Sequence, residues 1–188
     1  MKKQTIKTPN NKLLDIYDDG FTWHERYRFF HYVKNSAFGI MGSDGSSGIQ
    51  YDQINQIYSS FNSNDIDKMG MTNSKFFQQL ADEYDFFKRE WIQMRINVSP
   101  PCERNFVHTD SLGLTFLYYI NLEWKLEWGG HTLFMDDSLE NALYTSVYKP
   151  GRVVVFEGSI PHMIMTPTMS SAQYRYSLAI QFKEVTAS

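Results

Sequence analysis

The segment His108-Thr109-Asp110 places an imidazole and a carboxylate two positions apart. In an extended strand, both side chains project from the same face. A neutral imidazole beside a carboxylate supplies two of the three ligands of a 2-His-1-carboxylate facial triad, the arrangement that binds Fe(II). Taken alone the pair is a weak signal, because five histidines and 21 acidic residues produce such a spacing by chance about half the time.

The third ligand has to come from a distant strand, and His162 is the best placed histidine. It follows a turn at residues 149–152 and the apolar run 153–156, which has the pattern of a buried strand. A residue just after such a strand can face the interior of a barrel. The alternative is a histidine that only satisfies a backbone carbonyl, which is the commoner role of an isolated histidine.

The last apolar segment, residues 174–182, alternates between two faces. One face suits packing against helices and consists of Tyr174, Tyr176, Leu178, Ile180 and Phe182. The other face carries Arg175, Ser177, Ala179 and Gln181. Because arginine binds carboxylates bidentately and stays charged, an inward Arg175 beside a hydroxyl favours a dicarboxylate ligand. The alternative for Arg175 alone is an ion pair with a glutamate on the sheet surface.

The joint order of His-x-Asp, His and Arg-x-Ser resembles the metal and co-substrate signature of the Fe(II)/2-oxoglutarate-dependent dioxygenases. The segment Tyr118-Tyr119-Ile120-Asn121, followed by Trp124 and Gly129-Gly130, is similar to the prolyl hydroxylase branch of that family. The turn Lys149-Pro150-Gly151-Arg152 is also typical of that branch. The resemblance covers residues 91–183, and the combined motif is more specific than any of its parts.

This resemblance implies that His108, Asp110 and His162 bind Fe(II), with 2-oxoglutarate and O2 as co-substrates and ascorbate as an accessory reductant. The implied reaction hydroxylates an unactivated C–H bond, with a peptidyl proline as the leading acceptor, and needs no catalytic residue beyond the metal centre. An aspartate at position 110 favours hydroxylation, because halogenating relatives carry a small residue there.

For the co-substrate, the resemblance implies a salt bridge from Arg175 to the distal carboxylate of 2-oxoglutarate, assisted by Ser177 and by the hydroxyl of Tyr119. The sequence also departs from the branch. The segment between His162 and Arg175 is a few residues longer than is usual in that branch, so it requires an extra loop. The segment 100–103 lacks the expected upstream tyrosine, which leaves Asn97 as a candidate for the near side of the pocket.

Two other residues could bind a metal by type. His131 begins a strand after a glycine pair, and we interpret it as a structural histidine. Cys102 is the single cysteine, so an intramolecular disulfide and a multi-cysteine zinc site are excluded. A lone thiol fits a reducing cytosol, and we interpret it as a small buried or rim residue.

The first half of the chain carries helix signals. Thr22-Trp23-His24-Glu25 is a capping box. The helical spacing of Trp23, Tyr27, Phe30 and Lys34 then predicts a helix of about three to four turns. Residues 51–62 and 74–88 are two further helix candidates, the second capped by Asn73 or Ser74. Short strands are expected at 11–17 and 37–41.

From Trp91 the hydrophobic period changes to two. Residues 91–99 alternate, and 112–121 are apolar on both faces, as in a strand buried on both sides. Further strands are expected at 130–135, 142–148, 152–156 and 174–182. The pattern predicts a mainly β, α+β fold, namely a double-stranded β-helix (jelly roll) with N-terminal helices packed on one sheet. We expect one domain over 1–188, with a helical part at about 20–90 and the jelly-roll core at about 91–183.

The composition narrows the class of protein. The chain has 188 residues, of which 42% are hydrophobic and 16% aromatic, as in a folded protein. It has no apolar run long enough to cross a bilayer and no secretory leader, so we expect a cytoplasmic protein without membrane association. The formal charge of −3 argues against a broad nucleic-acid footprint.

Three functions therefore stay open. The leading one is a dioxygenase acting on a peptide or protein substrate. The second is an oxygenase of the same family acting on a nucleobase or a free amino acid. The third is a non-catalytic jelly-roll module that binds a ligand or partner. The sequence leaves the oligomeric state and the loop that covers the iron undetermined.

Overall fold

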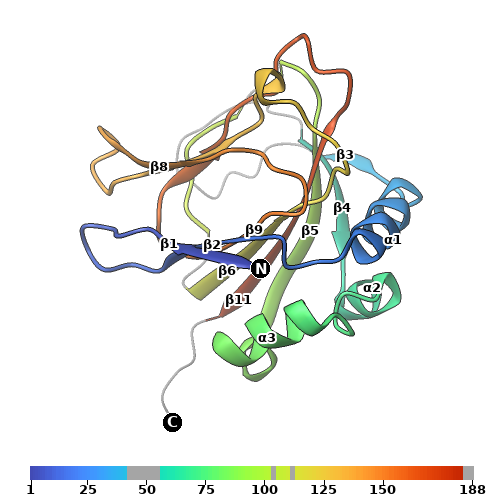
Figure 1. The fold of residues 1–188 in the computed structure, drawn as a ribbon. Coiled ribbons are helices and arrows are strands. Elements are labelled where there is room, and N and C mark those ends of the chain that lie inside the picture. The colour runs from blue at the N-terminus through green and yellow to red at the C-terminus, as the bar shows by residue number, and fades with distance from the viewer. Residues whose placement is uncertain (42–55, 103–104, 111–112, 184–188) are drawn as a thin grey trace.

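The computed structural model describes residues 1–41, 56–102, 105–110 and 113–183. Two antiparallel sheets form its centre (Figure 1). The larger sheet has the order β1-β2-β9-β6-β11-β5-β4-β3, and the smaller has the order β10-β7-β8. This two-sheet arrangement is the predicted jelly roll.

The strand bounds follow the predicted order, with three additional short strands. The large sheet contains β1 (Lys2–Thr5), β2 (Leu14–Asp18), β3 (Gly39–Met41), β4 (Gln56–Phe61), β5 (Trp91–Ser99), β6 (Gly113–Tyr119), β9 (Val153–Glu157) and β11 (Arg175–Lys183). The small sheet contains β7 (Thr132–Met135), β8 (Ala142–Ser146) and β10 (His162–Ile164). The sequence analysis predicted no strand at β1, β4 or β10.

Three helices lie on the side of the large sheet away from β8 (Figure 1). They are α1 (Trp23–Lys34), α2 (Ser63–Met69) and α3 (Lys75–Glu83). Two short 3-10 helices complete the described helical segments: η2 (Phe86–Lys88) follows α3, and η3 (Leu126–Trp128) lies between β6 and β7 in the sequence. The predicted capping box at Thr22 is present, since its side chain accepts from Glu25 N–H and Glu25 caps Thr22 in return. Ser74 is the N-cap residue of α3.

The helix predicted at residues 51–62 is wrong where the structure describes it. Residues 51–55 lie outside the described residues, and 56–61 form strand β4, which pairs with β5 from Ile57↔Val98 to Phe61↔Met94. Pairing with β5 satisfies the backbone of this segment, and side chains such as Ile57, Tyr58 and Phe61 favour a strand. The helix begins only at Ser63, after the Asn62 cap.

Helix α1 buries a different stripe from the one that contains Trp23 and Tyr27, the first two residues of the spacing that predicted it. Phe29 and Val33 are fully buried, whereas Trp23 and Tyr27 are 59% and 48% exposed. The reason is geometric, because only one stripe of a helix can face the sheet.

The two faces of the large sheet pack into separate cores. The outer core joins the helices to the sheet, and β11 contributes Tyr176, Leu178, Ile180 and Phe182 to it, as its alternation predicts. The inner core lies between the sheets and includes Leu117, Phe134 and Phe156. The opposite face of β11 is thereby turned toward the space between the sheets.

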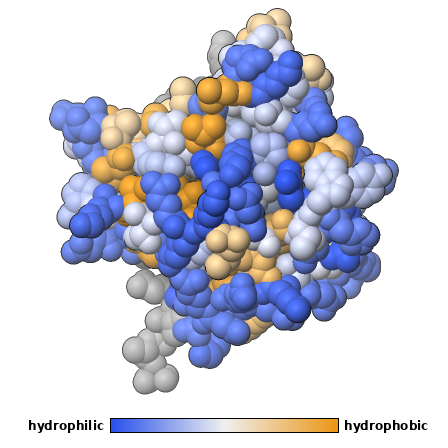
Figure 2. All heavy atoms as spheres, in the orientation of Figure 1, coloured by the Kyte–Doolittle hydropathy of each residue, from blue (hydrophilic) through white to orange (hydrophobic). Residues whose placement is uncertain are grey.

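The surface of the molecule is mixed in character. Figure 2 shows hydrophilic side chains over much of one face, with hydrophobic ones in separate patches. Within the described residues, no helix has the length and apolar character needed to cross a bilayer.

Candidate metal centre

The two predicted histidine ligands are joined by their backbones. His108 N–H donates to His162 O at 2.9 Å, and His162 N–H donates to His108 O at 2.8 Å. Asp110 N–H donates to Gly158 O at 2.8 Å, which fixes the segment after His108 beside the turn that leads to His162. The residues before β6 and at the start of β10 are thus held side by side although they are far apart in the sequence.

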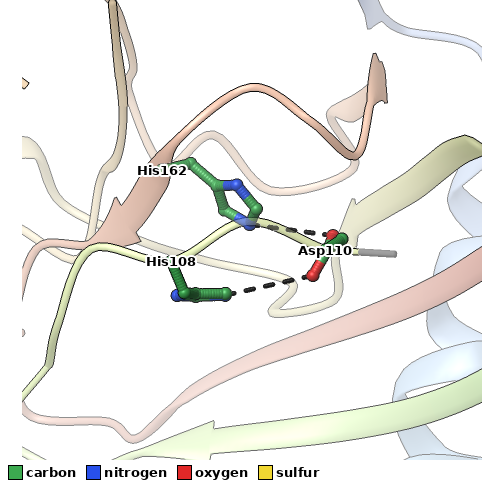
Figure 3. A group of neighbouring side chains, drawn as sticks. All are labelled: His108, Asp110 and His162. Atoms are coloured by element: carbon green, nitrogen blue, oxygen red, sulfur yellow. Dashed lines mark ion pairs between the residues drawn. The ribbon is translucent and has the colours of Figure 1, made fainter. Parts of the chain in front are cut away.

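This pairing brings three potential ligand atoms together (Figure 3). Asp110 carboxylate oxygens lie 4.0 Å from Nε2 of His108 and 3.7 Å from Nε2 of His162. One ligand atom from each residue lies within 4.8 Å of the other two. Two imidazoles and one carboxylate at this separation form the donor set that non-haem Fe(II) prefers. We refer to His108, Asp110 and His162 as the triad.

Hydrogen bonds orient both imidazoles for metal binding. Nδ1 of His108 lies 3.2 Å from Phe106 O, and Nδ1 of His162 lies 2.9 Å from Ile160 O. Since a carbonyl oxygen can only accept, each Nδ1 carries the proton, and each Nε2 keeps a lone pair directed toward Asp110.

Asp110 is held by two side chains. Thr115 Oγ1 donates to one carboxylate oxygen at 2.6 Å, and Gln181 Nε2 donates to the other at 2.8 Å. Such hydrogen bonds fix a ligating carboxylate in place. Sequence reasoning did not assign either residue, although Gln181 stood on the predicted inward face of its strand.

Burial favours the neutral form of the His162 side chain. The side chain is almost inaccessible, and this desolvation lowers its pKa, outweighing the opposing effect of Asp110. A lowered pKa favours the neutral imidazole, which is the form that binds a metal.

The triad lies on the wall of a cavity of about 430 Å³ between the two sheets, which we call the triad cavity. This volume is within the range of small-molecule sites. Strands β5, β6, β7, β10 and β11 contribute polar side chains to its wall, among them Asn97, Thr132 and Ser177. Asn97, the candidate for the near side of the pocket, therefore faces the same space as the triad.

Arg175 is fully buried and lies behind one wall of this cavity. Its guanidinium donates to Ser177 Oγ at 2.8 Å, to Thr132 Oγ1 at 3.3 Å and to Gly130 O at 2.7 Å. Ser177 and Thr132 both line the triad cavity. The predicted co-substrate arginine thus contacts the cavity wall through two hydroxyl groups.

Two tyrosine rings, which stack on each other, contact the guanidinium. Its carbon lies 5.3 Å from the Tyr119 ring centroid and 4.9 Å from that of Tyr148. Tyr119 is fully buried, and its hydroxyl donates to Thr132 Oγ1 at 2.9 Å. Gly130 permits this packing, because at its φ of +72° a Cβ would come within 3.1 Å of Arg175 Cδ. The glycine pair in the sequence therefore has a steric reason.

The competing candidates lie outside the triad. His131 Nδ1 accepts from Tyr148 N–H at 3.1 Å, and burial, with a contribution from Arg175, lowers its pKa. A neutral imidazole that accepts a backbone hydrogen bond has the structural role expected for His131. Cys102 is exposed rather than buried, and no other cysteine exists to pair with it.

Comparison with known proteins supports the fold. No model of a known protein family matches the chain, and no curated protein matches it in sequence. Among solved structures, a prolyl hydroxylase from Trichoplax adhaerens, in complex with a hypoxia inducible factor peptide fragment, is similar with a TM-score of 0.66 and 12% identity, covering 90% of this chain and 83% of that one. A prolyl-4-hydroxylase from Pseudomonas putida gives 0.60 and 12%, covering 92% and 93%.

A 2OG-Fe(II) oxygenase family protein from Burkholderia pseudomallei is also similar, with a TM-score of 0.66, 12% identity and coverage of 90% of this chain and 84% of that one. The chain therefore has the jelly-roll fold of the 2OG-Fe(II) oxygenases, as the sequence predicts. At this level of identity the likeness concerns the fold, and the function has to be argued from the site.

Proposed function

We propose that this protein is an Fe(II)- and 2-oxoglutarate-dependent oxygenase that hydroxylates an unactivated C–H bond. One observation carries the proposal: two imidazole Nε2 atoms and one carboxylate converge on the wall of a cavity. Both imidazoles are fixed in the metal-binding tautomer by backbone carbonyls. A jelly-roll binding module without catalysis has no need of this complete and oriented donor set.

The triad residues would hold Fe(II), with Thr115 and Gln181 fixing the Asp110 carboxylate. When bound, Fe(II) supplies the activation of O2, coupled to oxidative decarboxylation of 2-oxoglutarate to succinate. The protein's own task is to orient the reactants and to exclude water. The narrow space between two packed sheets suits that task.

Arg175 is the proposed anchor for the distal carboxylate of 2-oxoglutarate. Its buried guanidinium provides a permanent positive charge behind Ser177 and Thr132, whose hydroxyls line the cavity. Tyr119 supports this end of the site by donating to Thr132. We assign Arg175 and Ser177 to co-substrate binding and Tyr119 to positioning them.

For the acceptor, we propose a peptidyl proline as the leading substrate and a peptide or protein as the partner. The branch-like segment around Tyr119, Trp124 and Gly130 supports this choice, as does the likeness to prolyl hydroxylases, one of them in complex with a peptide. Structures similar in fold also include an alpha ketoglutarate dependent epimerase and a carbocyclase. A free amino acid is the second candidate acceptor.

The deciding experiment measures iron and turnover together. Protein prepared without oxygen is expected to bind one Fe(II) per chain, and His108→Ala is expected to bind little, because one of three ligands is lost. Proline-containing peptides are expected to stimulate succinate release. Equal iron in both proteins would overturn the oxygenase proposal, and stimulation by single-stranded oligonucleotides alone would replace the peptide substrate with a nucleobase.

A further inference from the structure

Arg95 is a second arginine of the triad cavity, and neither the triad nor the proposed co-substrate site uses it. It lies in the middle of β5, opposite Ala179 of β11 on one side and Ser60 of β4 on the other. Its side chain lines the cavity together with Gln181, the residue that holds Asp110. Arg95 therefore shares the space in which a substrate would meet the metal centre.

The Arg95 guanidinium is oriented by an aromatic ring but has no hydrogen-bond or ion-pair partner among the described residues. Its carbon lies 4.2 Å from the centroid of the Tyr58 ring, which fixes the guanidinium by a cation–π contact. Its Nε is buried without a hydrogen-bond acceptor, and no carboxylate forms an ion pair with it, within the part of the chain that the structure describes. By contrast, Arg152 pairs with Asp18 through two nitrogens. A buried donor without an acceptor is unfavourable, so this position suits an acceptor brought by a ligand.

The charge balance of the site with Fe(II) and 2-oxoglutarate bound also favours an anionic ligand beside Arg95. The Asp110 carboxylate and the two carboxylates of 2-oxoglutarate would balance Fe(II) and the Arg175 guanidinium. The positive charge of Arg95 then has no counterion on the cavity wall, where Asp110 is the only carboxylate among the described residues. A permanent positive charge that is partly buried on a cavity wall and has no counterion there attracts an anion.

We propose that Arg95 binds a carboxylate of the acceptor substrate and so selects acceptors that carry a carboxylate beside the reacting carbon. This inference rests on the proposed function and narrows its substrate class. Two sources can supply the carboxylate: an acidic residue next to the target in a peptide, or the α-carboxylate of a free amino acid. The stacked, planar guanidinium favours bidentate recognition of either one.

The test compares each acid with its amide. Acetylated and amidated peptide pools with a central proline carry Glu or Gln at each flanking position in turn, and free amino acids are compared with their amides. Succinate release is measured with the iron-loaded protein and saturating 2-oxoglutarate. The variants are Arg95→Gln, Arg95→Lys and the control Lys125→Gln, which removes a cation stacked on Trp128 away from the cavity.

We expect kcat/KM to be at least about tenfold higher for the acid than for its amide, because the amide lacks the negative charge and the second acceptor oxygen that the guanidinium would pair with. Arg95→Gln should reduce this ratio to near unity, Arg95→Lys should retain part of it, and Lys125→Gln should leave it unchanged. Preference within the peptide pools identifies an acidic flank as the source, and preference among the single compounds identifies the α-carboxylate.

Three results would overturn the inference. Acids and amides could perform equally, or Arg95→Gln could keep the preference. Alternatively, no carboxylate could stimulate succinate release by protein that binds both iron and 2-oxoglutarate. Calorimetric titration of 2-oxoglutarate in the absence of oxygen distinguishes failure of this inference from failure of the proposed function. A large loss of co-substrate affinity in Arg95→Gln would reassign Arg95 to the co-substrate, whereas failure of the unaltered protein to bind iron or 2-oxoglutarate would refute the proposed function itself.

Discussion

At the scale of single residues, every member of the triad is constrained by a partner of its own. Phe106 O and Ile160 O orient the two imidazoles, while Thr115 and Gln181 hold the two oxygens of Asp110. These constraints matter because a side chain that is ordered before the metal arrives loses less conformational entropy on binding it. The protein's own hydrogen bonds therefore help to set the arrangement of the three donor groups.

Gln181 gives a direct test of this arrangement. Replacing it in Gln181→Leu removes the hydrogen bond to Asp110 Oδ1, and we expect metal affinity to fall about 10- to 100-fold. Affinity is measured by titration with Mn(II), followed by electron paramagnetic resonance. Gln93→Leu is the matched control, because Gln93 pairs with Gln181 in the sheet and lines the same cavity. An equal loss in both variants would mean that the effect is general to the cavity.

At the scale of secondary structure, an ion-pair cluster ties the end of β2 to the start of β9, the strand that precedes His162 in the chain. Asp18, the last residue of β2, accepts from Arg152 Nε at 2.8 Å and Nη2 at 2.9 Å, just before β9 begins. Lys149 adds an ion pair at 3.1 Å. Burial would raise the pKa of Asp18, but the hydrogen bonds from Arg152 and Lys149 outweigh it and lower that pKa.

The lowered pKa of Asp18 predicts a pH-dependent contribution to stability. A carboxyl group that is more acidic when folded stabilises the protein above its unfolded pKa and loses this contribution as the pH falls through its folded pKa. We expect Asp18→Asn to lower the free energy of unfolding by about 1–3 kcal/mol at neutral pH. Urea unfolding at a series of pH values checks this. The difference between the two proteins should shrink in acid, and a difference independent of pH would contradict the assigned cause.

At the scale of the whole molecule, the large sheet separates two tasks. Its outer face packs against the helices in one core, and its inner face forms the cavity with the small sheet. The triad draws residues from positions more than 50 apart in the sequence, so the metal site exists only when the two sheets are assembled. Metal binding and folding are consequently linked.

This linkage predicts thermal stabilisation by the ligands. At a free Fe(II) concentration about 100 times its Kd, binding should stabilise the folded state by about 2.7 kcal/mol, which corresponds to a rise in Tm of about 5–11 °C for a chain of this size. Calorimetry in the absence of oxygen checks this, with 2-oxoglutarate expected to raise Tm further. His162→Ala should show almost none of the iron-dependent rise. A similar rise in this variant would place the iron elsewhere.

Local patterns in the sequence were sufficient for much of the fold and for the identity of the candidate ligands. The capping box at Thr22 specified where α1 begins, and alternation along 174–182 specified which side chains of β11 face the cavity. These features depend on residues within a few positions of one another. Residue type and spacing made His108, Asp110, His162 and Arg175 candidates, and the resemblance to a known family implied their roles.

Tertiary structure decided the features that depend on distant partners. Residues 56–61 became a strand because β5 offers an edge to pair with, and Trp23 and Tyr27 stayed exposed because the sheet meets another face of α1. Only folding brings Gln181 to Asp110, or leaves the Arg95 donor buried without an acceptor. A periodic pattern states which way a side chain points, but the group that it meets comes from another part of the chain.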